Sequence, residues 1–246
     1  MIISKTPYRI SFFGGGSDYP EWYMKHGGAV LSTTIDKYIY LSCRKLPPFF
    51  KHKHRIVWSK VELVNEIKEI KHKAVKEMLN QFKIKYGIEL HYDGDLPARS
   101  GMGSSSCFVV GMMNTLNLLK NKNLSKKELA KKSIFFEQKI MKETVGSQDQ
   151  IAASYGGFNR INFFSGGNFN VTPIKISKTS ISRLNKNLIL LYTGIQRTAH
   201  RIADTYVGKL KKEKHREIVQ ILEFVNEAGK VLKNKNFDDF GRLLHE

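Results

Sequence analysis

The order of apolar and polar residues along the chain predicts a mixture of strands and helices. Three stretches near the N-terminus favour β-structure, with a glycine-rich break after the first: Arg9–Phe13, Ala29–Ile35 and Lys37–Arg44. In Val61–Phe82, by contrast, apolar residues recur every three or four positions, which predicts one amphipathic helix. The N-terminal part of the chain is therefore expected to pack a helix against strands.

The middle of the chain continues this mixture. A strand is predicted around Ile88–Asp93, and the uncharged apolar segment Phe108–Leu119 has the length and composition of a buried helix. Ser125 and Glu128 form a capping box, so a further helix is expected to run from there to about Lys142. Two strands joined by a glycine-containing turn should follow, over Phe158–Phe164 and Phe169–Ile176.

The C-terminal part is predicted to be an incomplete second unit. A polar linker near Ser177–Asn187 leads into the strand Leu188–Tyr192, after which two helical stretches run to Glu246. A lone strand with a few helices has no sheet on which to pack. We therefore expect exposed apolar surface beyond the linker.

Composition adds limits on the class of protein. Hydrophobic residues make up 41% of the 246, as in ordinary globular proteins. The two cysteines, Cys43 and Cys107, match no metal-binding spacing and have apolar neighbours, so buried free thiols are expected. The N-terminal segment lacks the apolar stretch of a signal peptide and no segment approaches a membrane span, which favours a cytoplasmic protein without a membrane partner.

The formal net charge of +19 raises the question of nucleic-acid binding. The lysines are spread over polar helix faces, however, and no stretch interleaves aromatic and basic residues as a stacking platform would. Solvated helix faces explain the lysines better, so nucleic acid is not the expected partner. An excess of positive charge also suits an enzyme that acts on polyanions, and charge alone does not decide between the two.

The segment Asp93–Cys107, DGDLPARSGMGSSSC, carries the strongest functional signal. Its glycines let backbone N–H groups approach an oxyanion, the helix start carries partial positive charge, and serine hydroxyls can bind Mg²⁺. The segment therefore predicts an anion cradle, and the alternative is a tight turn capped by one serine. It is not a Walker loop, because no lysine follows the second glycine, and it lacks the third glycine of a Rossmann fingerprint.

Three further groups accompany this loop. In Pro7–Tyr19 a strand delivers Arg9 and then breaks into glycines and Asp18, whose carboxylate either accepts hydrogen bonds from sugar hydroxyls or satisfies backbone N–H groups of a surface turn. Asp149 opens a small-residue helical turn, where it either caps the helix or takes or steers a proton from an attacking hydroxyl. Glu137, on the preceding helix, is either a surface residue or a metal ligand.

In this order the groups resemble the motifs of the GHMP superfamily of small-molecule kinases. The sequence PARSGMGSSS resembles its phosphate-binding motif P-x-x-x-G-L-G-S-S-A, with Met102 and Ser106 replacing the usual Leu and Ala. The N-terminal group resembles the substrate motif that galactokinases write R-V-N-L-I-G-E-H-T-D-Y. Gly15 and Gly16, however, stand where Glu and His contact galactose, which argues against galactose as the substrate.

One branch of the superfamily shows further likeness. The G-G-G-S-D-Y form of the substrate motif, the stretch Trp58–Leu79 and the stretch Tyr192–Arg197 are similar to the D-glycero-D-manno-heptose 7-phosphate kinases of bacterial surface-polysaccharide synthesis. The third motif of the superfamily, a G-A-G-x-G-G loop of the C-terminal domain, is absent from this sequence.

The resemblance implies a kinase that uses ATP and Mg²⁺ to phosphorylate the anomeric hydroxyl of a heptose 7-phosphate. It implies that Asp149 is the catalytic acid–base group and that Arg9 either lowers its pKa or stabilises the transferring phosphoryl group. It implies a Mg²⁺ site at Glu137 with Ser104 or Ser105, without choosing between the serines. ATP phosphates are expected at Pro97, Gly101, Met102, Gly103, Ser104, Ser105 and Ser106. The sugar phosphate is expected at Arg9, Gly15, Gly16, Ser17, Asp18, Tyr19, Thr193 and Arg197.

The implied fold is α+β in two lobes. Residues 1–180 would form the N-terminal kinase domain with a left-handed β-α-β unit, and residues 187–246 an incomplete ferredoxin-like C-terminal lobe. Three alternatives remain at this stage: another sugar kinase of the superfamily, an inactive nucleotide- or nucleic-acid-binding relic, and a fragment of a longer kinase. The joint presence of Arg9, Asp18, Glu137 and Asp149 opposes a relic, because a buried carboxylate without its ligand is costly. The oligomeric state is left open, with a homodimer as one option.

Overall fold

The structure is a computed structural model that describes residues 1–195, 199–210 and 213–246. The chain divides into two compact units, each built from segments that are separate in sequence. The first unit comprises Met1–Tyr8, Ile35–Glu143 and Asp149–Tyr155, and the second comprises Arg9–Thr34, Thr144–Gln148 and Gly156–Glu246. The boundary between residues 180 and 187 that the sequence suggests stays a prediction.

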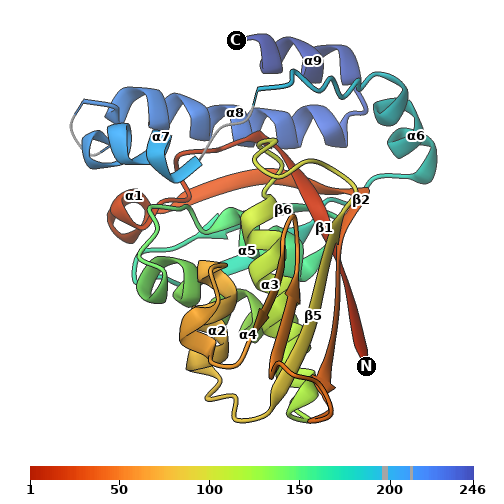
Figure 1. The fold of residues 1–246 in the computed structure, drawn as a ribbon. Helices are drawn as coiled ribbons and strands as arrows, with labels where there is room; N and C mark the ends of the chain where they lie inside the picture. The colour runs from red at the N-terminus through yellow and green to blue at the C-terminus, as the bar shows by residue number, and fades with distance from the viewer. Residues whose placement is uncertain (196–198, 211–212) are drawn as a thin grey trace. The chain divides into compact units, whose positions relative to one another are not determined.

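The first unit is built on a twisted sheet in the strand order β4-β3-β5-β2 (Figure 1). Strands β3 and β5 are parallel, whereas β4 pairs antiparallel with β3 and β5 pairs antiparallel with β2. Strand β1 (Ile2–Phe13) also pairs with β2. The bounds of the other strands are Gly28–Leu46 for β2, His54–Val57 for β3, Val61–Val64 for β4 and Gly87–Gly94 for β5.

Helices cover one face of this sheet. Helix α3 (Ser104–Leu119) is buried along most of its length, because nearly all its side chains are apolar or small, and it packs on the strands together with α2 (Lys73–Gln81) and α4 (Lys126–Phe135). A single π-helical turn, Phe136–Ile140, continues α4. A short 3₁₀ turn, Ile67–Glu69, and helix α5 (Gln148–Tyr155) complete the elements.

The second unit contains the last two strands of the seven-stranded sheet and the C-terminal helices. The first part of β2 pairs antiparallel with β6 (Phe158–Phe163), which pairs antiparallel with β7 (Phe169–Pro173). Aromatic and aliphatic side chains of three C-terminal helices form a core with Phe13, Ala29 and Leu31. The helices are α1 (Pro20–His26), α6 (Lys178–Lys186), α7 (Ala199–Tyr206), the 3₁₀ turn Val207–Lys209, α8 (His215–Lys233) and α9 (Phe237–His245).

Many of the predicted elements are confirmed. The strand before the serine loop, the hairpin of β6 and β7 and the capping box of α4 occur as expected, with Ser125 accepting from the Glu128 N–H and the Glu128 carboxylate accepting from the Ser125 N–H. Cys43 and Cys107 are buried free thiols. The two strands predicted over residues 29–44 form the single continuous strand β2.

The helix predicted over Val61–Phe82 is wrong in its first half. The segment begins as strand β4, because its backbone pairs with β3, and only its last third is helical. The His72 ring accepts from the Val75 N–H and caps α2 at that point. The apolar spacing misled because Ile70, Val75 and Met78 do bury in one core, but from a turn and a helix rather than from one helix.

Two predictions for the C-terminal part are also wrong. The stretch Ser177–Asn187 is not a linker but contains helix α6, which Ser177 caps and Leu184 anchors in the core. Leu188–Tyr192 is not a strand, because no strand in the described part of the chain pairs with it. Its side chains are 36–83% exposed, so the expected apolar surface beyond residue 187 is confirmed. Helix α9, which the sequence reading missed, buries Phe237, Phe240 and Leu243.

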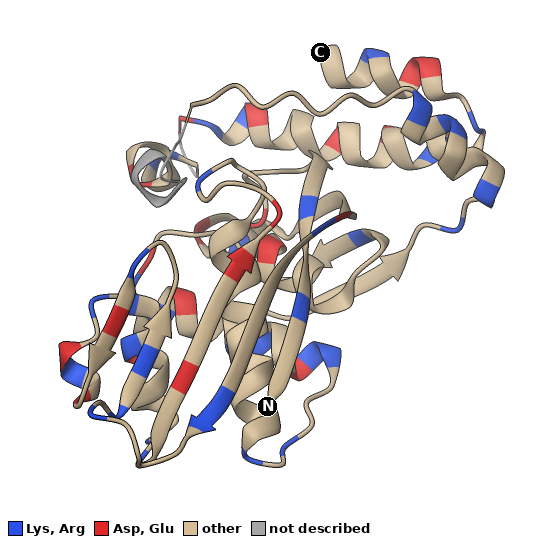
Figure 2. Cartoon of the chain, turned by 45° about the vertical axis from the view of Figure 1, so that its right-hand side comes forward, with Lys and Arg blue, Asp and Glu red and all other residues tan. Residues whose placement is uncertain are grey.

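Lys and Arg side chains are distributed over the helices and strands of both units rather than gathered on one element (Figure 2). Part of the positive charge therefore lies on strands and not only on helix faces. Within the described residues, no helix combines the length and the hydropathy that crossing a bilayer requires.

Gly14 is predicted to be essential for folding of the second unit. Its φ of +93° disfavours any side chain, and a Cβ there would lie 2.0 Å from the Ala29 carbonyl oxygen. We expect Gly14→Ala to lower the free energy of unfolding by roughly 2 kcal/mol or more, measured by urea denaturation. Gly229→Ala on α8 is the matched control, because a Cβ there meets nothing within 4 Å and it should stabilise slightly. Equal stability of Gly14→Ala and wild type would contradict the steric argument.

Candidate active site

The glycine–serine loop forms an open helix N-terminus in the first unit. Gly101 and Gly103 have φ values of +79° and +76°, which place them in the left-handed region, and α3 begins directly afterwards at Ser104. No side chain caps the helix and its first turn contains no acidic residue. The first amides of a helix have no acceptor within it, so they and the helix dipole favour an anion here. A Cβ on Gly101 would meet nothing within 4 Å, which leaves the approach open.

The three serines of this turn have different surroundings. The Ser104 hydroxyl accepts a long hydrogen bond of 3.4 Å from the Arg99 N–H and so closes the loop on itself. Ser105 is exposed. Ser106 is buried, and its hydroxyl donates to Oε2 of Glu137 at 2.8 Å. The predicted phosphate-binding serines therefore differ in access, and Ser105 has the most accessible hydroxyl.

Glu137 is fully buried on the π-helical turn that follows α4, not on the surface. Its Oε2 also accepts from the side-chain amide of Gln150, which is itself fully buried on α5. Burial raises the pKa of Glu137 to about 8, against the hydrogen bonds from Gln150 and Ser106 that lower it; the charges of Glu143 and Asp149 add to the rise. Without a cation, the carboxyl group is therefore predominantly protonated at neutral pH.

Two buried oxygens, one of this carboxyl group and one of the neighbouring amide, have no hydrogen-bond partner. Oε1 of Glu137 and Oε1 of Gln150 each lack a hydrogen bond in the structure. Unpaired buried oxygens are costly, and carboxylate and amide oxygens are the ligands that Mg²⁺ prefers. The residues present therefore fit a magnesium ion. No cluster of three or more His, Cys, Asp or Glu occurs in the described part of the chain, so such an ion would be completed by phosphate oxygens, hydroxyls or water.

Gln150 is the site residue that the sequence reading missed. A signal was present, because Gln150 is the polar member of a short helix that is otherwise apolar where it is buried. Asp149 precedes it. Helix α5 begins at Gln148, so Asp149 lies inside the first turn instead of occupying the capping position before it. Its charge acts on Glu137, which places Asp149 near the same carboxyl group.

In the second unit, the buried Asp18 carboxylate accepts hydrogen bonds from backbone N–H groups of the predicted substrate loop and of the first residue of α5. Asp18 is 1% exposed, and its two oxygens accept from the Gly16 N–H at 3.1 Å and the Gln148 N–H at 3.2 Å. Its carbonyl accepts from the Ser147 N–H, and a Cβ on Gly146 would lie 1.9 Å from its Oδ2. Asp18 thus holds the segment that leads to Asp149. Its predicted role as a sugar ligand stays a prediction.

The other predicted substrate residues of this unit fall into two groups. The buried Ser17 hydroxyl lies 2.8 Å from the Gly14 carbonyl and accepts from the Ala29 N–H, so it ties the loop to β2. Tyr19 packs edge-on against Tyr206, with their hydroxyls 3.3 Å apart. Gly15 has open space, since only the Gln148 amide would come within 4 Å of a Cβ there.

The remaining predicted residues are placed as follows. Arg9 lies half-buried on β1, and Thr193 is exposed after the apolar segment, with its hydroxyl accepting from the Ile195 N–H. A Cβ on Gly16, whose φ is +96°, would touch the end of Ile218. Pro97 is exposed ahead of the glycine–serine loop, and Met102 is partly buried against the core. Arg197 lies outside the described residues. Arg9 belongs to one unit and Asp149 to the other, so their cooperation stays a prediction.

Comparison with known proteins agrees with this geometry. Residues 66–157 match the family description "GHMP kinases N terminal domain". The chain is 30% identical to a D-glycero-alpha-D-manno-heptose 7-phosphate kinase of Campylobacter jejuni, over 98% of this chain and 74% of the relative. It is 27% identical to a galactokinase of Pyrococcus furiosus, over 89% of this chain and 63% of the relative.

The fold is also found in solved structures. A crystal structure described as a D-glycero-D-manno-heptose 1-phosphate kinase from Bacteroides thetaiotaomicron superposes with a TM-score of 0.81, at 21% identity, covering 99% of this chain and 76% of that one. The chain therefore belongs to the GHMP kinase family and has its two-lobed α+β fold. It is a phosphotransferase with an alcohol group as acceptor.

The protonation of Glu137 predicts a specific pH dependence of stability. Its folded pKa of about 8 lies above the ordinary 4.5. The stability that the protonated form contributes is therefore complete below about pH 4.5 and is lost as pH rises through about 8, at up to ~1.4 kcal/mol per pH unit. Urea unfolding between pH 5 and 9 in EDTA should show this loss in wild type and a flatter profile in Glu137→Gln. Parallel profiles for the two proteins would show that Glu137 is not protonated.

Proposed function

We propose that this protein transfers the γ-phosphoryl group of ATP to the anomeric hydroxyl of D-glycero-D-manno-heptose 7-phosphate. The observation that carries the proposal is the uncapped N-terminus of α3, with three serines in different roles beside the buried carboxyl group of Glu137. Membership of a kinase family and 30% identity to a heptose 7-phosphate kinase support it.

The glycine–serine loop would hold the nucleotide phosphates. Amide groups of the first α3 turn point toward the open side, and the accessible Ser105 hydroxyl can add a hydrogen bond to a phosphate oxygen. Glu137 and a serine hydroxyl would hold Mg²⁺, with Gln150 fixing the orientation of the carboxylate. When bound, the ion neutralises charge on the phosphates. The cost of burying an unpaired Glu137 is then removed.

Asp149 would act on the acceptor. It sits in the first turn of α5, and the buried Asp18 ties down the segment just before it. In phosphoryl transfer the protein mainly positions groups and stabilises charge, so an aspartate within reach of the acceptor hydroxyl would orient it and take its proton. Arg9 is proposed to stabilise charge on the transferring group.

The substrate loop accounts for the choice of sugar. Gly15 leaves open space where a galactokinase places a side chain, which gives room to a bulkier sugar. We propose that Thr193 and Arg197 contribute to binding of the 7-phosphate, since a planar guanidinium recognises phosphate well.

The role of Asp149 can be tested by one isosteric change. Asp149→Asn keeps the shape but removes the charge, so turnover should fall by roughly 10² or more while nucleotide affinity is retained. The matched control is Asp36→Asn, because Asp36 is an exposed residue of β2. Near wild-type turnover in Asp149→Asn would limit that residue to a structural role.

The choice of sugar is tested by comparing substrates directly. With Mg·ATP, we expect a kcat/KM for heptose 7-phosphate at least ~100-fold above that for galactose, because a missing phosphate leaves cationic donors unpaired. Initial rates on heptose 7-phosphate, heptose, galactose and mevalonate at fixed enzyme concentration provide the measurement. Equal or better use of galactose or mevalonate would defeat the heptose assignment and leave the kinase assignment standing.

A further inference from the structure

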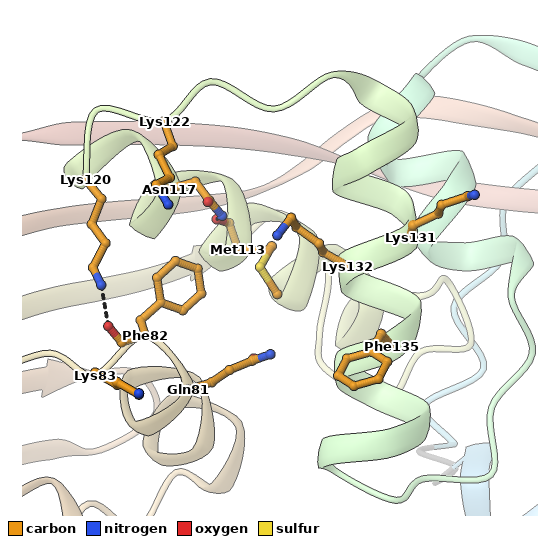
Figure 3. Close-up of a pocket in the computed structure, with 10 residues that line it drawn as sticks. All are labelled: Gln81, Phe82, Lys83, Met113, Asn117, Lys120, Lys122, Lys131, Lys132 and Phe135. Atoms are coloured by element: carbon orange, nitrogen blue, oxygen red, sulfur yellow. Dashed lines mark hydrogen bonds between the residues drawn. The ribbon is translucent and has the colours of Figure 1, made fainter.

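A cavity of about 520 Å³ lies at the other end of helix α3, away from the glycine–serine loop (Figure 3). Met113, Asn117 and Lys120 line it from the C-terminal part of α3. Sixteen residues of α-helix span roughly 24 Å, so the cavity is well separated from the serines that open the helix. The remaining lining residues come from the end of α2, from the loop after α3 and from α4: Gln81, Phe82, Lys83, Lys122, Lys131, Lys132 and Phe135.

The charged residues that line the cavity are all positive. Five of the ten lining residues are lysines and none is acidic. In the described part of the chain, no ion pair joins a carboxylate to Lys83, Lys122 or Lys132, although the charge of Lys132 acts on Glu128 one turn earlier on α4. Lys120 donates to the Phe82 carbonyl oxygen. Figure 3 shows Lys83 and Lys132 entering from opposite sides of the cavity. Such an arrangement repels cations and attracts a ligand that carries more than one negative charge.

The floor of the cavity is apolar and aromatic. Phe82 and Phe135 contribute rings and Met113 a thioether. Phe135 is 51% exposed, whereas Leu129 of the same helix is buried. Lys83 has a φ of +49°, a backbone conformation that favours glycine or asparagine, and yet carries a long cationic side chain. An exposed ring beside several lysines suits a flat aromatic group linked to phosphates.

We infer that this cavity is a second ligand site, distinct from the site proposed for the kinase reaction, and that it binds a nucleoside diphosphate. Its volume lies within the range of small-molecule sites. The base would lie on the exposed ring of Phe135, because Lys120 already lies over the Phe82 ring, 5.6 Å from its centroid. Lys83, Lys120 and Lys132 would contact the diphosphate.

Equilibrium dialysis of labelled ADP against the full chain tests the inference. Wild type should bind two ADP per chain, and Lys83→Gln/Lys132→Gln should weaken the second site at least ~10-fold, because charge-assisted hydrogen bonds are lost. The matched control Lys37→Gln/Lys175→Gln removes the same charge from exposed lysines outside the cavity and should retain both sites. Ser104→Ala/Ser105→Ala should instead lose the first site. If Ser104→Ala/Ser105→Ala retained both ADP sites, that result would count against the kinase site and not against the cavity.

Three results would overturn the inference. The first is binding of only one ADP per wild-type chain, with an affinity that Lys83→Gln/Lys132→Gln does not change. Another is equal weakening by the Lys37→Gln/Lys175→Gln control, which would mean nonspecific attraction by the net charge. The third is displacement of ADP from the cavity at equal or lower concentration by inorganic tripolyphosphate, which would deny a role to the nucleoside, or by a single-stranded RNA, which would make the cavity a nucleic-acid surface. Phe135→Ser, which keeps every charge, should also weaken ADP at the second site at least ~10-fold while leaving tripolyphosphate unchanged.

Discussion

Glu137 is a carboxyl group without access to solvent, and its two hydrogen bonds link the first turn of α3, the π-helical turn after α4 and helix α5. A buried carboxyl group is tolerated only when it is neutral or paired. The two oxygens of this carboxyl group differ. Oε2 accepts hydrogen bonds from Ser106 and Gln150, whereas Oε1 has no hydrogen-bond partner. The first unit therefore folds around a polar cluster that is incomplete without a proton or a cation, which is the property expected of a functional site rather than of a core.

A comparable constraint organises the second unit. At Gly14 the backbone lies so close to β2 that there is no room for a Cβ atom. The Ser17 hydroxyl donates to the Gly14 carbonyl and accepts from the Ala29 N–H of β2. The buried Asp18 carboxylate accepts from the Gln148 N–H. These contacts explain why a glycine-rich loop is held in one conformation and is not a mobile surface turn. They also explain how Gly15 can stay open, because its neighbours carry the structural contacts.

Part of this could be predicted from the chain alone. The Gly–Ser motif and the uncharged segment after it predict a buried helix with an open N-terminus, because glycine spacing and hydropathy act locally. The capping box of α4 and the hairpin of β6 and β7 were predictable for the same reason. Val61–Phe82 and Leu188–Tyr192 were predicted wrongly, since whether an apolar stretch becomes strand or helix depends on which backbone lies beside it.

The sequence by itself determined the residue types from which the site is made: glycines, hydroxyls and carboxylates in an order that marks a family. Only the tertiary structure decided what each of them does. Local pattern made a surface position the default for Glu137 and placed Mg²⁺ beside Ser104 or Ser105. Packing instead buried Glu137, turned Ser106 toward it and left Ser105 exposed. Gln150 entered the site only because α5 packs its polar face against that carboxyl group. Burial and pairing are properties of contacts between segments far apart in the chain, and the periodicity of one segment does not contain them.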